Sequence, residues 1–194
     1  MATPVGHVLA GLAVYETVAV PRVAEAGPGR ALALALLAMV FAVGPDLDFV
    51  PGILHGRPAL YHQGLSHSLG FAVLVGAVGA AVFRRAGRSY RSVFLVLSLA
   101  YASHLVVDLF GPDGREPYGI PLFWPLSSEY FQSPVTPFMM VRHAPGTDAH
   151  TAVWIRGVFS WHNVLAIGVE VLLLGPLMLL ARRMSRARVD RKAT

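Results

Sequence analysis

Residues 92–110 read SVFLVLSLAYASHLVVDLF and are followed by Gly111-Pro112. A helix needs about 20 mainly apolar residues to cross a bilayer, and this run reaches that length. His104 and Asp108 stand four residues apart near its end, so they share one face of the helix. The run therefore predicts a membrane-spanning helix with two potential metal ligands close to one membrane surface.

Four further apolar stretches flank this helix along the chain: residues 4–20, 29–43, 66–83 and 162–181. Thr3 is a suitable N-cap for the first, with Pro4 at the first helical position, and Gly175-Pro176 predicts a kink in the last. Apolar residues make up 55% of the 194 residues and charged residues 14%. Soluble domains contain about a quarter charged residues. We therefore predict an all-α fold, a polytopic membrane bundle of about five helices that forms one domain over residues 1–194.

Basic residues indicate how the bundle crosses the membrane. They gather in Arg84–Arg91, in the tail Arg182–Lys192, and at Arg22 and Arg30 beside the first turn. Loops rich in Lys and Arg are usually cytoplasmic. Alternating the helices then places the N-terminus and residues 46–65 and 111–161 on the non-cytoplasmic side of the inner (plasma) membrane. This topology explains the net charge of +5, so no nucleic-acid partner is expected.

The long segment 111–161 is rich in Pro, Gly and aromatic residues, which indicates a partly structured extracytoplasmic region at headgroup level. Within it, residues 135–142 and 151–157 are predicted to pair as a hairpin across Pro145-Gly146.

Seven potential metal ligands fall on the non-cytoplasmic face when this topology is applied. They are His7, Asp46, Asp48, His62, His67, His104 and Asp108. The topology was derived from the Arg residues and the helix lengths, so it is independent of the ligands. Taken singly, each has another interpretation, such as a hydrogen-bonded core pair, a helix cap or a surface histidine. Together they favour a metal site, because ionisable groups at membrane depth are costly and usually functional.

The chain contains no cysteine, so a metal site would use nitrogen and oxygen ligands only. That mixture suits zinc, which we expect, with manganese or iron as alternatives, and it disfavours calcium. Seven ligands exceed one tetrahedral shell, so one or two divalent ions are expected. The candidate catalytic residues are Asp46, Asp48, His67 and Glu129, as general base, ligand or proton shuttle. Glu129 could equally be an exposed loop carboxylate.

Other polar residues have weaker functional interpretations. Glu170 lies in the middle of an apolar run and needs a partner inside the bundle. Arg115, Arg142 or Arg156 could neutralise a phosphate, although a solvated loop charge is the simpler interpretation of each. The remaining histidines are expected to be solvated loop residues (His55, His143, His150) or, for His162, interfacial.

A series of motifs over residues 3–130 resembles a known family. The motifs are Thr3-Pro4-Val5-Gly6-His7, Gly44-Pro45-Asp46-Leu47-Asp48, His62-x-x-x-x-His67-Ser68, Ser103-His104-x-x-x-Asp108 and Phe123-Trp124-Pro125. In this order they are similar to the membrane-bound metal-dependent hydrolases, also described as inner-membrane-associated, LexA-binding hydrolases. Residues after about 135 resemble nothing in particular.

This family is distantly similar to the zinc-dependent phospholipase C superfamily. By that likeness the metal ligands would be His7, Asp48 or Asp46, His62, His104 and Asp108, and a metal-bound water would attack a phosphodiester. The superfamily's second His and its His-x-x-x-Glu pair are not evident, and His162 is not followed by Glu at the matching place. The likeness therefore implies one or two ions rather than three.

We expect a hydrolase that acts on a phosphoester in a lipid or another amphipathic substrate, with membrane lipids as its partners. Two other functions remain open. One is a non-catalytic membrane protein with a structural metal site. The other is a metal or proton transporter, which the mostly apolar helix centres disfavour. The sequence does not indicate an oligomeric state.

Overall fold

The computed structural model of the protein describes residues 1–20, 27–84, 89–143 and 151–193. Its helices, in chain order, are α1 (Pro4–Val14), η1 (Tyr15–Ala19, a π-helical turn), α3 (Pro28–Val43), η2 (Gly44–Asp48), α4 (Phe49–Leu54), η3 (Pro58–Leu60), η4 (Leu65–His67), α5 (Leu69–Arg84), α6 (Tyr90–Leu109), α7 (Thr151–Val158) and α8 (Trp161–Ala193). The described residues form no strand, and Ile120 and Phe131 make one isolated bridge. The predicted all-α fold is confirmed.

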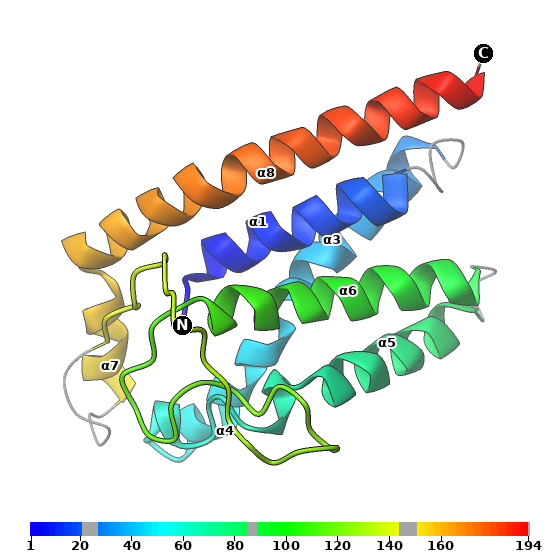
Figure 1. Ribbon diagram of the computed structural model, residues 1–194. Helices are drawn as coiled ribbons and strands as arrows, with labels where there is room; N and C mark the ends of the chain where they lie inside the picture. The colour runs from blue at the N-terminus through cyan, green and yellow to red at the C-terminus, as the bar shows by residue number, and fades with distance from the viewer. Residues whose placement is uncertain (21–26, 85–88, 144–150, 194) are drawn as a thin grey trace.

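Helix α6 occupies the centre of the bundle, where it packs against α1, α3 and α5 (Figure 1). Its Leu97 and Leu105 are completely buried. Helix α8 covers the opposite side of α1 and leaves most of its own surface exposed. The helix with the proposed ligands His104 and Asp108 is therefore the one most enclosed by protein.

Three described segments are long and apolar enough to cross a membrane: Gly29–Leu54, Tyr90–Leu109 and Trp161–Arg191. The helix Leu69–Phe83 is also apolar but shorter. Large apolar side chains on the outer faces of these helices are exposed, including Leu36, Val73 and Leu172. Such faces suit contact with lipid rather than water.

The helix boundaries follow local sequence signals, but one predicted helix is longer and another begins later than predicted. Thr3 caps α1 as predicted, because its side chain accepts a hydrogen bond from the backbone N–H of Val5. The last helix does not end at Ala181 but continues to Ala193, since arginine is a good helix former. It also runs through Pro176 without interruption. The third helix begins at Leu69 rather than Ser66, with Ser68 Oγ accepting from the N–H of Phe71 at 3.1 Å.

The predicted hairpin is wrong. Thr151–Val158 forms the helix α7, and residues 135–142 form no strand in the part of the chain that the structure describes. A segment as short as 151–157 does not distinguish a strand from a helix by its sequence pattern. Pro145-Gly146, the proposed turn, lies outside the described residues.

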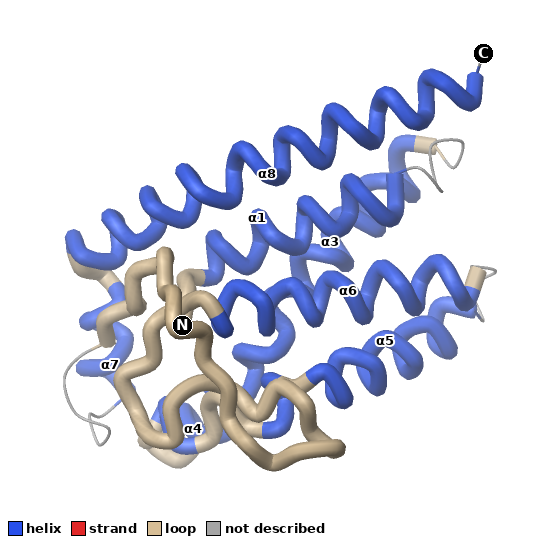
Figure 2. The backbone as a smooth tube through the Cα atoms, viewed as in Figure 1, coloured by secondary structure: helices blue, strands red, loops and turns tan. Residues whose placement is uncertain are grey.

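The two ends of the bundle differ in character. At one end, which we call the site end, the N-terminus, α4, α7 and the long loop after α6 lie together, and Figure 2 shows how much of this end is loop. The loop covers the start of α5, where the backbone N–H groups of Leu69 and Gly70 donate to the carbonyls of Leu122 and Trp124. A side chain at Gly70 would collide with that Trp124 carbonyl.

The opposite, basic end holds the C-terminus of α8 and the start of α6. Exposed arginines there are Arg30, Arg91, Arg182, Arg183, Arg186 and Arg188. Arg22 and the central part of the basic segment 84–91 lie outside the described residues. The site end also has exposed arginines, Arg57, Arg142 and Arg156, so the basic end holds most but not all of those in the described chain.

Candidate metal centre

Four helical elements and one loop bring the seven predicted ligands to the site end. His104 and Asp108 lie in the last two turns of α6, Asp46 and Asp48 on η2, and His7 on the first turn of α1. His67 is on η4, and His62 precedes it in the loop after η3. Two short 3-10 turns carry the carboxylates and His67: η2 contains Pro45, and η4 follows Gly64.

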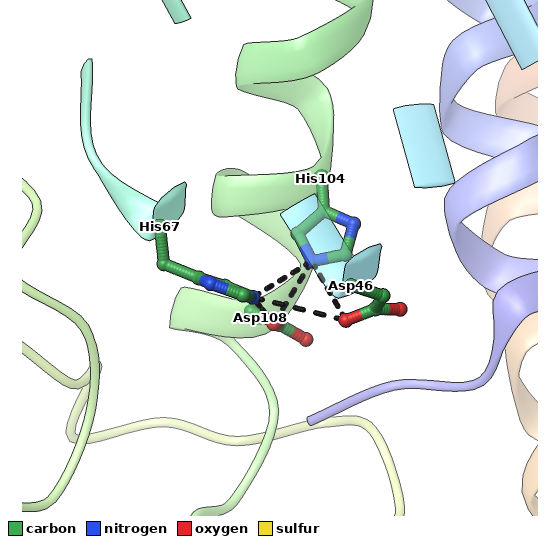
Figure 3. Close-up of side chains that lie close together, drawn as sticks. All are labelled: Asp46, His67, His104 and Asp108. Atoms are coloured by element: carbon green, nitrogen blue, oxygen red, sulfur yellow. Dashed lines mark hydrogen bonds and ion pairs between the residues drawn. The ribbon is translucent and has the colours of Figure 1, made fainter. Parts of the chain in front are cut away.

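Four of these side chains meet at one place, as Figure 3 shows. His104 Nε2 lies 3.2 Å from Asp108 Oδ2 and 3.5 Å from Asp46 Oδ1. His67 Nε2 lies 3.6 Å from Asp108 Oδ2 and 3.8 Å from Asp46 Oδ1. All four ligand atoms lie within 4.8 Å of one another. We call Asp46, His67, His104 and Asp108 the four-ligand group.

The tautomers of the two histidines suit metal binding. His104 Nδ1 lies 2.8 Å from the carbonyl oxygen of Ala42, which can only accept, so Nδ1 carries the hydrogen. His67 Nδ1 likewise lies 3.1 Å from Asp48 Oδ2. Metal-binding histidines usually donate their other ring N–H to a carbonyl or a carboxylate in this way. When each ring is neutral, its Nε2 therefore has a lone pair that faces the four-ligand group.

Each carboxylate of the four-ligand group has one oxygen without a hydrogen-bond partner in the described chain. Among the described residues, Asp46 Oδ1 and Asp108 Oδ2 are buried without a hydrogen-bond partner. The other oxygen of Asp108 accepts a hydrogen bond from the backbone N–H of Ala2 at 3.1 Å. Buried polar atoms without partners are costly. A divalent cation at the centre of the four-ligand group would satisfy both oxygens, so these residues fit a metal ion.

A second group shares His67 with the first. Asp48 Oδ1 lies 2.9 Å from His62 Nδ1, while Asp48 Oδ2 accepts from Ser66 Oγ at 2.8 Å and from the N–H of Gln63 at 3.1 Å. Gln63 has a φ of 62°, a left-handed conformation that a non-glycine residue seldom adopts. The ligand atoms of Asp48, His62 and His67 also lie within 4.8 Å of one another. We call these three residues the three-ligand group.

His7 lies beside the four-ligand group. Its ring stacks on that of His104 with 3.6 Å between the centroids, and its Nε2 lies 3.5 Å from Asp108 Oδ1. Both ring nitrogens are buried without a hydrogen-bond partner among the described residues. His7 can therefore reach an ion only from the edge of the group, or it can hold the His104 ring in place.

The two histidines of the loop have opposite electrostatic surroundings. Burial lowers the pKa of His62, and the hydrogen bond to Asp48 only partly opposes this. Burial also acts to lower the pKa of His67, but the neighbouring carboxylates of Asp46 and Asp48 outweigh it and raise the pKa to about 9. At neutral pH His62 is a neutral imidazole, whereas His67 holds a proton until a cation replaces it.

Several predicted residues lie outside both groups. Glu129 is exposed, and its backbone N–H donates to the Ser127 hydroxyl. Its carboxylate belongs to neither ligand group of the described chain. His55 is exposed, and His162 Nε2 lies 2.8 Å from the carbonyl of Met140, which agrees with an interfacial residue. His150 lies outside the described residues.

His143 and Arg115 are not solvated loop residues. His143 is half-buried and stacks on Trp154 with 4.3 Å between the ring centroids. Burial and the nearby His62 lower its pKa to about 4. Arg115 donates to the carbonyls of Ala59 and His62 and so fixes the loop that contains His62. No local pattern in the sequence reveals these contacts, because both depend on distant segments meeting.

A pocket of about 370 Å³ opens on the outer side of His62. Its wall contains Arg142, His143 and Trp154 from the long segment and Phe49 from α4, and Arg115 also borders it. We call it the polar-rim pocket. It gives the three-ligand group access to the outside of the site end.

A family model described as "YdjM inner membrane protein" matches residues 1–189. Neither a curated protein nor a solved structure is significantly similar to the chain. The family match covers nearly the whole chain, including the part after residue 135 in which the sequence showed no resemblance. The chain therefore belongs to this family, which is the membrane-bound metal-dependent hydrolase or LexA-binding family that the motifs indicated.

Proposed function

We propose that this member of the YdjM inner membrane family is a metal-dependent hydrolase that cleaves a phosphoester in a lipid or another amphipathic substrate. The observation that supports it most is the four-ligand group. There, two Nε2 atoms and two unpartnered carboxylate oxygens converge, and His67 and His104 are oriented from behind by Asp48 and the Ala42 carbonyl.

The proposed ion is zinc, held by Asp46, His67, His104 and Asp108, with manganese or iron also compatible with two nitrogens and two oxygens. A bound divalent cation supplies Lewis acidity, which makes a water more acidic and neutralises charge on a phosphoester. Because Asp48 already orients His67 and His62, we propose one ion in the four-ligand group. A second ion in the three-ligand group would have to displace these hydrogen bonds.

His62 and Asp48 are the proposed proton-transfer pair. Asp48 fixes the His62 ring through Nδ1, which leaves Nε2 as the basic atom. Nε2 lies 2.9 Å from Met1 Sδ, and both residues line the polar-rim pocket, so the Met1 side chain would move aside when water reaches Nε2. In the hydrolysis, the oxygen of water bonds to phosphorus as the bond from phosphorus to the alcohol oxygen breaks. His62 Nε2 accepts the proton that the water loses and returns it to the leaving alcohol oxygen, so the protein ends unchanged.

The substrate class follows from where the site lies. The four-ligand group is at the ends of apolar helices long enough to cross a membrane, and aromatic residues border the pocket beside it. We propose that this end faces the non-cytoplasmic side, because most of the exposed arginines of the described chain lie at the other end. Arg142 on the pocket wall would attract an anionic headgroup.

The test is to purify the protein in detergent, measure its metal content and assay hydrolysis of phosphodiesters and phospholipids. The variant His104→Ala with Asp108→Ala should lose both the metal and the activity. His55→Ala, which removes an exposed histidine outside both groups, is the matched control and should keep both. Full activity in the double variant would refute the proposal.

A non-catalytic, structural metal site is the second candidate. One observation favours it: His67, His104 and Asp108 are almost completely buried, as expected for a coordinatively closed site. Bound metal without an exchangeable water, together with no turnover on any lipid or phosphodiester, would support this function instead. Metal flux in proteoliposomes would point to transport.

A further inference from the structure

A second pocket, of about 460 Å³, lies on the other side of the three-ligand group. Its walls are apolar and come from α3 (Val40, Phe41) and α5 (Phe71, Val75), with Tyr101 of α6 behind them. We call it the apolar pocket. Small-molecule sites usually measure about 300–1,000 Å³ and are mostly apolar with a few polar groups, and this pocket has that character.

The apolar pocket faces the region where a bilayer would surround the bundle. Val40 is 63% exposed and lies within the candidate span Gly29–Leu54. Leu47, at the same rim, is 67% exposed. The molecules that reach such an opening from the side are lipids, whose hydrocarbon chains carry no groups that need hydrogen bonds.

The polar end of the apolar pocket belongs to the proposed reaction centre. Asp48 and Ser66 lie on its wall and are joined by the hydrogen bond from Ser66 Oγ to Asp48 Oδ2. Tyr101 donates its hydroxyl hydrogen to the Ser66 carbonyl at 2.9 Å. Because Asp48 also binds His62, the apolar pocket and the polar-rim pocket meet the same His62–Asp48 pair from two sides.

We propose that the apolar pocket binds one hydrocarbon chain of a membrane lipid and thereby presents the lipid's phosphoester to the three-ligand group. The role as a substrate subsite rests on the proposed function, whereas the binding of the chain does not. An amphipathic molecule fits this arrangement because its two halves match the two pockets. A water-soluble phosphoester would use only the polar-rim pocket.

The binding test uses phosphatidylglycerol with a photoactivatable diazirine in one acyl chain, mixed into phosphatidylethanolamine vesicles that contain the full-length protein. After illumination, mass spectrometry should find the label on residues that line the pocket, such as Val40, Leu47, Phe71 and Val75. Val75→Phe, which places a ring inside the pocket, should reduce this labelling roughly tenfold, equivalent to about 1.4 kcal/mol. Val40→Phe fills the pocket from the opposite wall and should do the same.

Val73→Phe is the matched control, because Val73 is on α5 but exposed outside the pocket wall. It should leave the labelling unchanged. Metal content and a single size-exclusion peak in detergent would establish that each variant folds. Label spread evenly over the exposed faces of α3, α5 and α8, or equal labelling of Val75→Phe and wild type, would overturn the proposal.

Activity measurements separate this inference from the proposed function. The ratio of lipid hydrolysis to hydrolysis of a water-soluble phosphodiester should fall in Val75→Phe and not in Val73→Phe. Labelling confined to the pocket without any hydrolysis would support the chain site while refuting the hydrolase. Hydrolysis with a ratio that Val75→Phe does not alter would refute the role of the pocket as a substrate subsite while supporting the hydrolase.

Discussion

Glu170, about a third of the way along α8, accepts a hydrogen bond from the backbone N–H of Thr3 at 2.6 Å, and its carboxylate also binds the Thr3 hydroxyl. The N–H of Gly6 donates to it at 2.9 Å. A Cβ atom at Gly6 would lie 2.8 Å from this carboxyl group, so only glycine allows the approach. The buried carboxylate thus holds the start of α1, the segment that supplies His7 and the Ala2 N–H that binds Asp108.

Glu170→Gln should weaken metal binding although Glu170 contacts no proposed ligand. Glutamine has one acceptor oxygen, and its NH₂ group would face N–H donors, so the start of α1 would shift. Groups that orient metal ligands contribute about 10–100-fold to metal affinity. A competitive chelator titration measures the change. Glu16→Gln is the control, because the ion pair that Glu16 makes with Arg182 within the described residues is long, at 3.9 Å, and partly exposed. Equal affinities in the two variants would contradict this role of Glu170.

His62→Ala and His104→Ala should fail in different ways. His104→Ala removes a proposed ligand and should lose the metal. His62→Ala should retain the metal but lose roughly 10²–10⁴-fold in kcat, the usual contribution of a general acid–base group. Metal analysis of both purified variants, together with phosphodiester kinetics, distinguishes the roles. If His62→Ala also loses the metal, His62 is a ligand and the proton-transfer assignment is wrong.

Zinc binding at pH 7 should release a proton from His67. Its pKa of about 9 in the metal-free protein, against 6.5 normally, means that the ring is protonated at pH 7, whereas a ligand must be deprotonated. Affinity should therefore fall by roughly tenfold per pH unit below that pKa. Calorimetry in two buffers with different ionisation enthalpies counts the released protons. Asp48→Asn, which removes one carboxylate that stabilises protonated His67, should release fewer protons on zinc binding. A binding enthalpy that is the same in both buffers would contradict the raised pKa of His67.

The same pKa shift predicts how pH affects the metal-free fold. Because the pKa of His67 is raised on folding, its ion pairs contribute stability that is complete below pH 6.5 and is lost as the pH rises through about 9. Thermal unfolding of chelator-treated protein between these values should show a falling Tm. Adding zinc should reduce this dependence, and a Tm that rises over this interval would contradict the shift.

Membrane orientation can be tested with single cysteines, since the chain has none of its own. Leu126→Cys lies at the site end, where Leu126 is 92% exposed, and Arg188→Cys lies at the basic end. If the site end is non-cytoplasmic, a membrane-impermeant maleimide should label the first in intact spheroplasts and the second only after lysis. The reverse pattern would place the candidate metal centre on the cytoplasmic side.

The fold was largely predictable because long apolar runs have few stable structures in a membrane. The runs over 29–43 and 92–110 became α3 and α6 almost as predicted. The segment after α6 was harder, because short helices such as α7 depend on tertiary contacts, here the stacking of Trp154 on His143. For the same reason His143 was expected to be solvated.

The convergence of the ligand residues was predictable from topology, but their division into two groups was not. Asp46 and Asp48 are two residues apart, yet one faces His104 and the other faces His62, because η2 is a 3-10 turn. The partners that orient the site, the Ala42 carbonyl and the Ala2 N–H, are backbone groups. Every residue has such groups, so side-chain identity gives no sign of them.

The His67 ring touches Asp48 through Nδ1 and the four-ligand group through Nε2. The imidazole of His67 therefore belongs to both ligand groups, so a change in one group also affects the other. A cation at Nε2 would draw electron density from the ring and make the Nδ1–H a stronger hydrogen-bond donor to Asp48. The Asp48 carboxylate would then be a weaker acceptor for His62. The identity of the ion would therefore change the basicity of His62, although the ion does not contact this residue.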